Sequence, residues 1–123
     1  MTFLKGQITA NLEPMLEDVS ILGMRGERIQ FNAILDTGFN GSLVLPRKIG
    51  RRARLEPFNR TQYQLADGSV VQDILYRGTL QVSGRRIVVL LSLTDAEVGL
   101  VGMEIITGRI ATFDLRKMTV DVK

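Results

Sequence analysis

The most informative stretch of the sequence is Phe31–Pro46, FNAILDTGFNGSLVLP. Its first part alternates apolar and polar residues, which is typical of a strand with one buried face, and a carboxylate, Asp36, follows directly. The end of a strand holds a side chain rigidly beside the core. Thr37 offers a short hydroxyl that can brace the loop, and Gly38 allows a second backbone or a substrate to approach closely. With a second short strand over Leu43–Leu45, the stretch predicts a loop that presents Asp36.

A structural alternative exists for Asp36. In an ordinary turn, an aspartate side chain accepts a hydrogen bond from its own backbone two residues on, and Asp-Thr-Gly alone is too short to exclude this. Two further segments bear on the choice. Ala66-Asp67-Gly68-Ser69 separates two strand-like runs and predicts a hairpin, and Leu100-Val101-Gly102 precedes a short apolar segment.

Alternation with a period of two residues dominates the rest of the chain. A single strand is predicted from Ile29 to Leu35, and tight turns between strands are predicted at Ser83–Arg85 and Arg116–Lys117. Two short helices are predicted, one within Arg47–Arg54 and one over Met103–Thr107, with Gly108 suited to the position after the second. Many short strands joined by tight turns predict an all-β fold, a sandwich or a barrel.

The composition excludes several kinds of chemistry. The chain has 123 residues, which suits one domain spanning residues 1–123, and it contains neither Cys nor His. Thiolate nucleophiles, disulfides, Ser–His relays and imidazole metal ligands are therefore absent. Because Asp, Glu, Lys and Tyr remain for acid–base work, carboxylates are the leading candidates, and we expect no metal and no cofactor.

The first residues form no signal peptide, and the longest nearly unbroken apolar run, Ile87–Leu93, is too short to cross a membrane. We therefore expect a cytoplasmic protein without a membrane partner. The net charge is +3, and much of the basic excess lies in Arg47–Arg54. Such a run can attract phosphates, but aromatic residues do not interleave with it, so nucleic acid is not the expected partner.

Three of the segments above, in their order and spacing, resemble the retropepsins, the single-domain relatives of pepsin. Asp36-Thr37-Gly38 matches the catalytic triplet of that family, Leu65–Val70 matches its flap, and Leu100-Val101-Gly102 matches the segment that packs beneath the catalytic loop. The residues after the triplet, Phe39-Asn40-Gly41 and then Leu43–Pro46, look most like the bacterial branch. The resemblance implies a closed, barrel-like β-sandwich of the acid-protease type with one short C-terminal helix.

The chain departs from the family at two places. Pepsin-like enzymes have Ser or Thr directly after the triplet, where this chain has Phe39, which reshapes the cleft. The segment Ala66–Ser69 is also more polar than the glycine-rich viral flap. Substrate preference therefore cannot be transferred from the family.

A single triplet implies a homodimer. Peptide hydrolysis by carboxylates needs one general base and one protonated partner, and two carboxyl groups about 3 Å apart share a proton and titrate as a pair. A two-fold dimer supplies the second carboxylate by placing Asp36 beside its own copy. The resemblance implies that Thr37 of each chain reaches across to the other loop. Thr2–Leu4 and Thr119–Val122 are candidates for intersubunit strands, with pairing inside the chain as the alternative.

The sequence therefore predicts an aspartic endopeptidase that acts on a peptide or protein. The predicted catalytic residues are Asp36, Thr37 and Gly38, and the predicted substrate-binding residues are Phe39, Asn40, Ala66, Asp67, Gly68 and Ser69. A peptide-binding module without turnover needs the same residues and stays open. A basic β-barrel that binds nucleic acid is a weaker alternative, because Asp36 repels phosphate. A glycosidase also uses paired carboxylates but usually needs a longer cleft.

Overall fold

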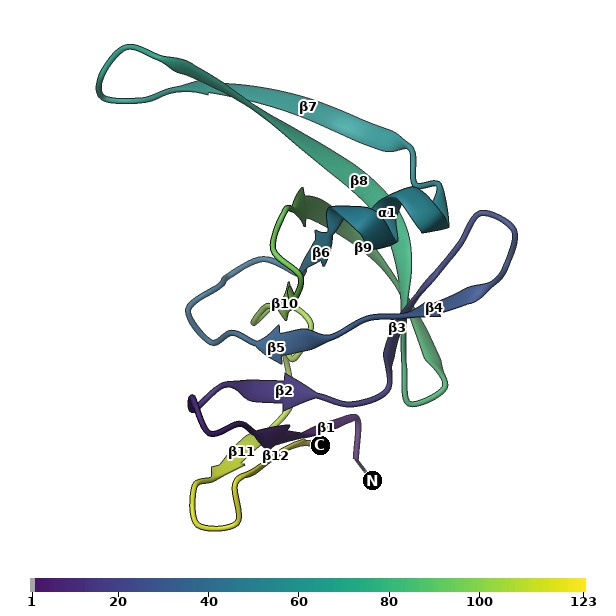
Figure 1. The fold of residues 1–123 in the computed structure, drawn as a ribbon, viewed down its shortest axis with the longest axis vertical. Coiled ribbons are helices and arrows are strands. Elements are labelled where there is room, and N and C mark those ends of the chain that lie inside the picture. The colour runs from purple at the N-terminus through teal and green to yellow at the C-terminus, as the bar shows by residue number, and fades with distance from the viewer. Residues whose placement is uncertain (1) are drawn as a thin grey trace.

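The structure, a computed structural model, describes residues 2–123 and, within them, every side chain except that of Tyr63. Strands dominate this part of the chain, as predicted (Figure 1). The elements are β1 (Leu4–Ile8), β2 (Pro14–Leu16), β3 (Val19–Leu22), β4 (Arg28–Gln30), β5 (Ala33–Leu35), β6 (Leu43–Pro46), α1 (Arg47–Ala53), β7 (Pro57–Gln64), β8 (Val70–Val82), β9 (Arg85–Thr94), β10 (Gly99–Val101), β11 (Ala111–Asp114) and β12 (Thr119–Val122).

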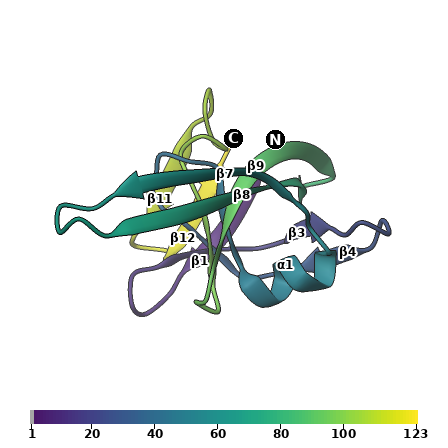
Figure 2. The ribbon, with the colours of Figure 1, turned by 90° about the horizontal axis from the view of Figure 1, so that it is seen from above.

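The strands form one sheet, which is open. Its order is β11-β12-β1-β2-β5-β10-β6-β9-β8-β3-β4, and β7 pairs with β8 beside this path. The prediction of a closed barrel is therefore wrong. Closure requires the first and last strands to pair, but β4 and β11, with three and four residues, stand at the two ends of the strand order and lie apart in the molecule (Figures 1 and 2).

One apolar core lies on the inner face of this sheet. Alternate residues of the strands point into it, as β1 shows by its strictly alternating burial. Each fully buried leucine contributes about 1.5–3 kcal/mol to folding. The largest fully buried side chains are Leu4, Ile21, Leu35, Leu43, Leu45, Leu80 and Leu91.

The strand predicted over residues 29–35 is divided into β4 and β5. Its predicted inward residues, Ile29, Phe31, Ala33 and Leu35, are all buried. The chain nevertheless changes partners between the two halves, because β4 pairs with β3 whereas β5 pairs with β2 and β10. The hairpins predicted at Asp67-Gly68, Ser83–Arg85 and Arg116–Lys117 are confirmed.

Of the two predicted helices, only the first is present. Helix α1 follows Pro46 and ends at Arg54, whose left-handed backbone (φ 58°) stops it. The predicted C-terminal helix is wrong, because Met103–Thr107 forms successive tight turns with hydrogen bonds to residues three positions earlier. The segment is too short for its few hydrogen bonds to offset the free-energy cost of helix nucleation. Its first backbone N–H groups donate to the carbonyls of Phe39 and Gly41 instead. Gly108 does adopt the positive φ predicted for it, 78°.

The terminal strands pair inside the chain. β1 lies between β12 and β2, with Leu4 opposite Val122, and the Phe3 N–H donates to the Val122 carbonyl at 2.7 Å. The structure thus shows the intramolecular alternative for Thr2–Leu4 and Thr119–Val122.

Strand β8 is the longest, with 13 residues, and belongs to two parts of the fold. Its second half ends at the buried residues Leu80 and Val82, between β9 and β3. Its first half pairs with β7 in a hairpin that projects far from the body of the sheet (Figure 1).

Candidate active site

Asp36 lies directly after β5, at the start of the loop Asp36–Ser42, which we call the aspartate loop. β5 runs between β2 and β10, and Leu35, the last residue of β5, is buried. The Asp36 N–H donates to the Val101 carbonyl at 2.9 Å. The backbone that bears the carboxylate is therefore fixed on both sides, as predicted for a side chain at a strand end.

The Asp36 carboxylate accepts one local hydrogen bond. The Gly38 N–H donates to its Oδ1 at 2.9 Å, which is the turn that the structural alternative describes. Within residues 2–123 no hydrogen bond to Oδ2 is recorded. Oδ1 of Asp36 is therefore fixed by the backbone, whereas Oδ2 is available to a ligand, a water or a second carboxyl group.

The segment after β10 supports the aspartate loop from below. The Gly102 N–H donates to the Ser42 carbonyl at 2.9 Å and the Met103 N–H to the Phe39 carbonyl at 2.8 Å. A Cβ at Gly102 would overlap the Gly41 carbonyl oxygen. Glycine is therefore required there because two backbones are in contact, and the structure brings together the two segments that the sequence singled out.

Phe39 folds back over this contact. Its ring lies against Gly41 and Gly102, since a Cβ at either position would come within 2.7 Å of the ring. The side chain is half-buried and fills space that a larger residue at either glycine would occupy. That Phe39 shapes a substrate cleft stays a prediction.

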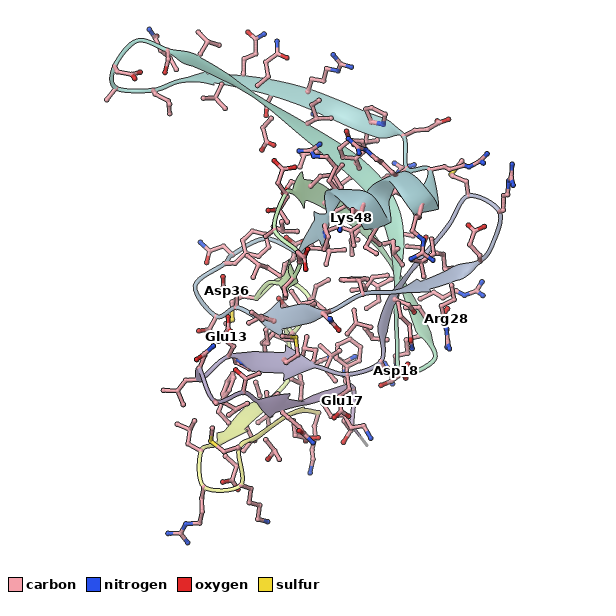
Figure 3. The ribbon with its side chains drawn as sticks, viewed as in Figure 1. Glu13, Glu17, Asp18, Arg28, Asp36 and Lys48 are labelled. Carbon is pink, nitrogen blue, oxygen red and sulfur yellow. The ribbon has the colours of Figure 1, made fainter. Side chains whose placement is uncertain are left out.

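Two grooves flank the loop, and each has a volume of about 440 Å³. The first, which we call the aspartate groove, is lined by Leu12–Pro14, residues 34–37 and Phe113. Figure 3 shows Glu13 beside Asp36 at the same side of the molecule. The second, the hairpin groove, is bounded by Phe39 and residues 41–43, Asp73 and Leu75 of β8, residues 88–92 of β9, and Glu104.

The predicted flap tip is a self-contained turn. Asp67 Oδ1 accepts hydrogen bonds from the Ser69 hydroxyl at 2.6 Å and the Ser69 N–H at 2.9 Å. These bonds, the hydroxyl foremost, lower the pKa of Asp67 below its usual range. The tip projects to the same side of the molecule as the aspartate loop (Figures 1 and 2). Ala66–Ser69 are all exposed, and none of their recorded hydrogen bonds reaches that loop.

The remaining predicted residues lie on the open side of the aspartate loop. Thr37 and Gly38 are exposed, and a Cβ at Gly38 would meet only Asp36 Oδ1, at 3.3 Å. Asn40 is exposed and faces a separate hollow beside Met103 and Arg109. The structure thus gathers Asp36, Thr37 and Phe39 at the two grooves and leaves the flap tip at a distance.

Sequence reasoning missed several lining residues of the grooves. One signal was available for β9: its continuous apolar run provides apolar residues on both faces, and Val88 remains 69% exposed on the outer one. Glu13 and Phe113 gave no signal, because they reach Asp36 only through the order of the strands in the sheet.

The basic run predicted as a possible phosphate site forms α1. Arg47 Nε lies 2.8 Å from Asp95 Oδ1, and Lys48 Nζ lies 3.8 Å from Glu97 Oε1. Arg47 lowers the pKa of Asp95 through this contact. Two of the basic side chains are therefore partly neutralised.

Two further features are absent from residues 2–123. No group of three or more acidic side chains there is arranged to hold a metal ion. No helix in the same range is long and apolar enough to cross a membrane.

Comparisons with known proteins bear on the fold of the chain. No protein-family model matches the chain, and no curated protein matches its sequence. Among solved structures, the chain is similar to the EIAV protease in complex with the inhibitor HBY-793, with 25% sequence identity and a TM-score of 0.52. The match covers 80% of this chain and 91% of the protease chain. The chain therefore has a retropepsin-like fold, that of a retroviral aspartic protease.

Proposed function

We propose that this protein is an aspartic endopeptidase that acts as a homodimer. The observation that supports this most strongly is the position of Asp36, whose backbone is fixed by Val101 and whose loop rests on Gly102. Within a retropepsin-like fold, Asp36 is thus a carboxylate on a fixed backbone, and its Oδ2 is available to bind a ligand. Phe39-Asn40-Gly41 after the triplet supports the bacterial, single-domain type.

The reaction needs two carboxyl groups that share one proton. The ionised Asp36 of one copy removes a proton from water while the oxygen of that water bonds to the scissile carbonyl carbon. The protonated Asp36 of the second copy donates a hydrogen bond to the carbonyl oxygen and stabilises the charge that develops there. The first Asp36 then transfers the proton that it took from water to the amide nitrogen, the C–N bond breaks, and an amine and a carboxylic acid are released.

The other predicted residues have roles in binding and support. Thr37 and Gly38 hold the loop, and Thr37 has an exposed side chain that is free to reach a second copy. Phe39 and Asn40 border the substrate from below. The tip Ala66–Ser69 closes over the peptide, which requires the β7–β8 hairpin to move toward the aspartate loop.

The decisive experiment is the substitution Asp36→Asn. An amide cannot act as the general base, so we expect cleavage of a peptide library to fall by about 100- to 10,000-fold while the dimer stays folded. The measurement is the cleavage rate from acidic to neutral pH, with the dimer followed by sedimentation.

The matched control is Asp18→Asn. Asp18 is exposed, has a positive φ that asparagine tolerates, and lies well apart from Asp36 (Figure 3). It removes the same charge without touching the loop. Wild-type cleavage by the Asp36→Asn protein would refute the proposal. Peptide binding without cleavage by the wild type would identify the chain as a binding module.

A further inference from the structure

Helix α1 has a basic outer side that the proposed catalysis does not use. Its small residues Gly50 and Ala53 are buried, and a Cβ at Gly50 would lie 2.8 Å from the Leu93 side chain, so this side packs on the core. Arg51 and Arg52 are exposed on the other side. The packing of α1 therefore keeps these two charges in solvent.

The first turn of α1 is already paired with carboxylates of the chain itself. Arg47 and Lys48 lie where the helix dipole disfavours positive charge, and the loop between β9 and β10 compensates for them. Arg47 Nε lies 2.8 Å from Asp95 Oδ1, and Lys48 Nζ lies 3.8 Å from Glu97 Oε1. An Asp-Ala-Glu segment, residues 95–97, thus lies against the helix and shows the ligand chemistry that suits it.

The later basic residues of α1 have no such partners. In the described part of the chain, residues 2–123, no ion pair is recorded for Arg51, Arg52 or Arg54. Arg51 and Arg52 follow Lys48 by three and four residues, so three positive charges share one side of the helix and repel one another. A ligand that brings negative charge would relieve this repulsion.

The turn between β3 and β4 extends the basic side of α1. The Met24 N–H donates to the Ala53 carbonyl at 2.9 Å, so the turn lies against the end of the helix (Figures 1 and 2). It brings the exposed Arg25 and Arg28 there. Its one acidic side chain, Glu27, is turned toward its own backbone and accepts from the Arg25 N–H at 3.4 Å. We call the following five residues the arginine surface: Arg25, Arg28, Arg51, Arg52 and Arg54.

The residues around the arginine surface favour an acidic polypeptide over other anions. Residues 23–28 and 47–54 include no aromatic side chain on which the bases of a single-stranded nucleic acid could stack. Ile49 is half-buried, Ala53 is buried and only Met24 is exposed among their large or small apolar side chains, which is too little to enter a lipid bilayer. Carboxylates, by contrast, are the groups that α1 already binds.

We propose that the arginine surface is an exosite, a substrate-binding surface remote from Asp36, for a carboxylate-rich segment of a protein substrate. This rests on the proposed function, because the bound segment belongs to the chain that Asp36 cleaves. Figure 3 shows Arg28 and Asp36 on opposite sides of the molecule, and β6, with four residues and a length of about 13 Å, separates the aspartate loop from α1. The acidic segment therefore lies several residues or more from the scissile bond.

Binding of a fluorescent octaglutamate peptide tests the surface without cleavage. We expect the Asp36→Asn protein to bind it in fluorescence anisotropy, more weakly as ionic strength rises. The double substitution Arg51→Gln with Arg52→Gln should weaken binding about tenfold, because two exposed ion pairs are lost. The matched control, Arg116→Gln with Lys117→Gln, removes two exposed charges from the β11–β12 turn and should leave binding within about twofold of the parent protein. Thermal unfolding establishes that both variants fold.

Other anions are measured with the same proteins. The probes are oligothymidylate of equal charge and vesicles that contain phosphatidylglycerol. If either binds more tightly than octaglutamate and is lost in the Arg51 and Arg52 variant, the ligand is a phosphate compound and the exosite for acidic protein is overturned. An equal loss of octaglutamate binding in both double variants would reduce the effect to net charge and overturn the exosite as well.

Kinetics then connect the surface to catalysis. A peptide that the wild type cleaves is joined, through a Gly-Ser linker of about ten residues, to a run of glutamates or, in the matched substrate, glutamines. The linker keeps the glutamates outside the grooves. We expect the glutamate run to lower KM about tenfold and leave kcat unchanged, because binding at a remote surface stabilises substrate and transition state equally. The Arg51 and Arg52 variant should lose this advantage, and an advantage that persists there would overturn the exosite.

The outcomes separate the exosite from the endopeptidase. Cleavage of peptides by a protein that does not bind octaglutamate overturns the exosite and leaves the proposed function standing. A wild type that cleaves no peptide, but binds octaglutamate through Arg51 and Arg52, supports the acidic-peptide surface and overturns the endopeptidase.

Discussion

At the scale of single residues, the site depends on two positions that are 66 residues apart in the sequence. Asp36 provides the carboxylate, and Gly102 provides the space in which the aspartate loop rests. The sequence predicted both, because each occurs in a short recognisable segment. It predicted neither Glu13 nor Phe113, since their position beside Asp36 depends on which strands become neighbours, and no local pattern encodes that order.

The contact at Gly102 gives the first prediction at this scale. Gly102→Ala places a methyl group against the Gly41 carbonyl oxygen, which cannot move without moving the whole loop. We expect a loss of about 1–3 kcal/mol in the free energy of unfolding, measured by urea denaturation, and a parallel loss of cleavage. The control is Gly78→Ala, where the new Cβ meets no backbone atom and only the ends of three side chains, those of Leu91, Ile21 and Leu55. Equal stability of the two variants would contradict the packing described here.

At the scale of elements, hairpins were predictable and the C-terminal helix was not. An Asp-Gly pair between alternating runs specifies its turn locally, so β7–β8 formed as expected. The segment Met103–Thr107 was predicted to be helical, but its first N–H groups donate hydrogen bonds to carbonyl groups of the aspartate loop. Tertiary contacts decide its conformation, and the sequence pattern does not contain them. The closed barrel was implied by the family resemblance, and no local pattern in the sequence indicates that the sheet stays open.

The turn at the hairpin tip is predicted to respond to acid. Its hydrogen bonds from Ser69 lower the pKa of Asp67 in the folded state below the value in the unfolded chain. A depressed pKa means that the stabilisation is fully present above about pH 5 and is lost as the pH falls below about 3.9 and through the folded pKa. We expect the Ser69 amide signal in NMR spectra to shift together with the Asp67 carboxyl group over this acidic range.

The variant Ser69→Ala serves as the comparison for this titration. Removing the hydroxyl takes away the largest cause of the shift, so the pKa of Asp67 should move up toward its usual range. An Asp67 that titrates identically in both proteins would show that the turn is not held in this way.

At the scale of the whole molecule, charge is distributed unevenly. The chain has a net charge of +3, yet the charged side chains that line the two grooves are all acidic: Glu13 and Asp36 in one, Asp73 and Glu104 in the other. Basic residues gather instead on α1. A peptide that enters the grooves therefore meets a negative surface, which favours basic side chains.

This distribution predicts a substrate preference. We expect peptides with Lys or Arg near the scissile bond to have a kcat/KM about fivefold above matched peptides with Glu, because one exposed ion pair contributes about 1 kcal/mol. The advantage should shrink as ionic strength rises. Asp73→Asn should reduce it, while Asp18→Asn should not. A preference for Glu-containing peptides would contradict the assignment of the grooves.

The length of β8 has a mechanical consequence. Its buried end at Leu80 and Val82 is clamped between neighbouring strands, and the same unbroken strand becomes one arm of the projecting hairpin. The hairpin therefore resembles a cantilever more than a lid on a hinge, and the travel of its tip is the sum of small bends along many residues. The amplitude and the rate of the tip's motion then depend on how rigidly the buried end of β8 is packed between β3 and β9. Substitutions deep in the core are expected to alter its motion without touching the site.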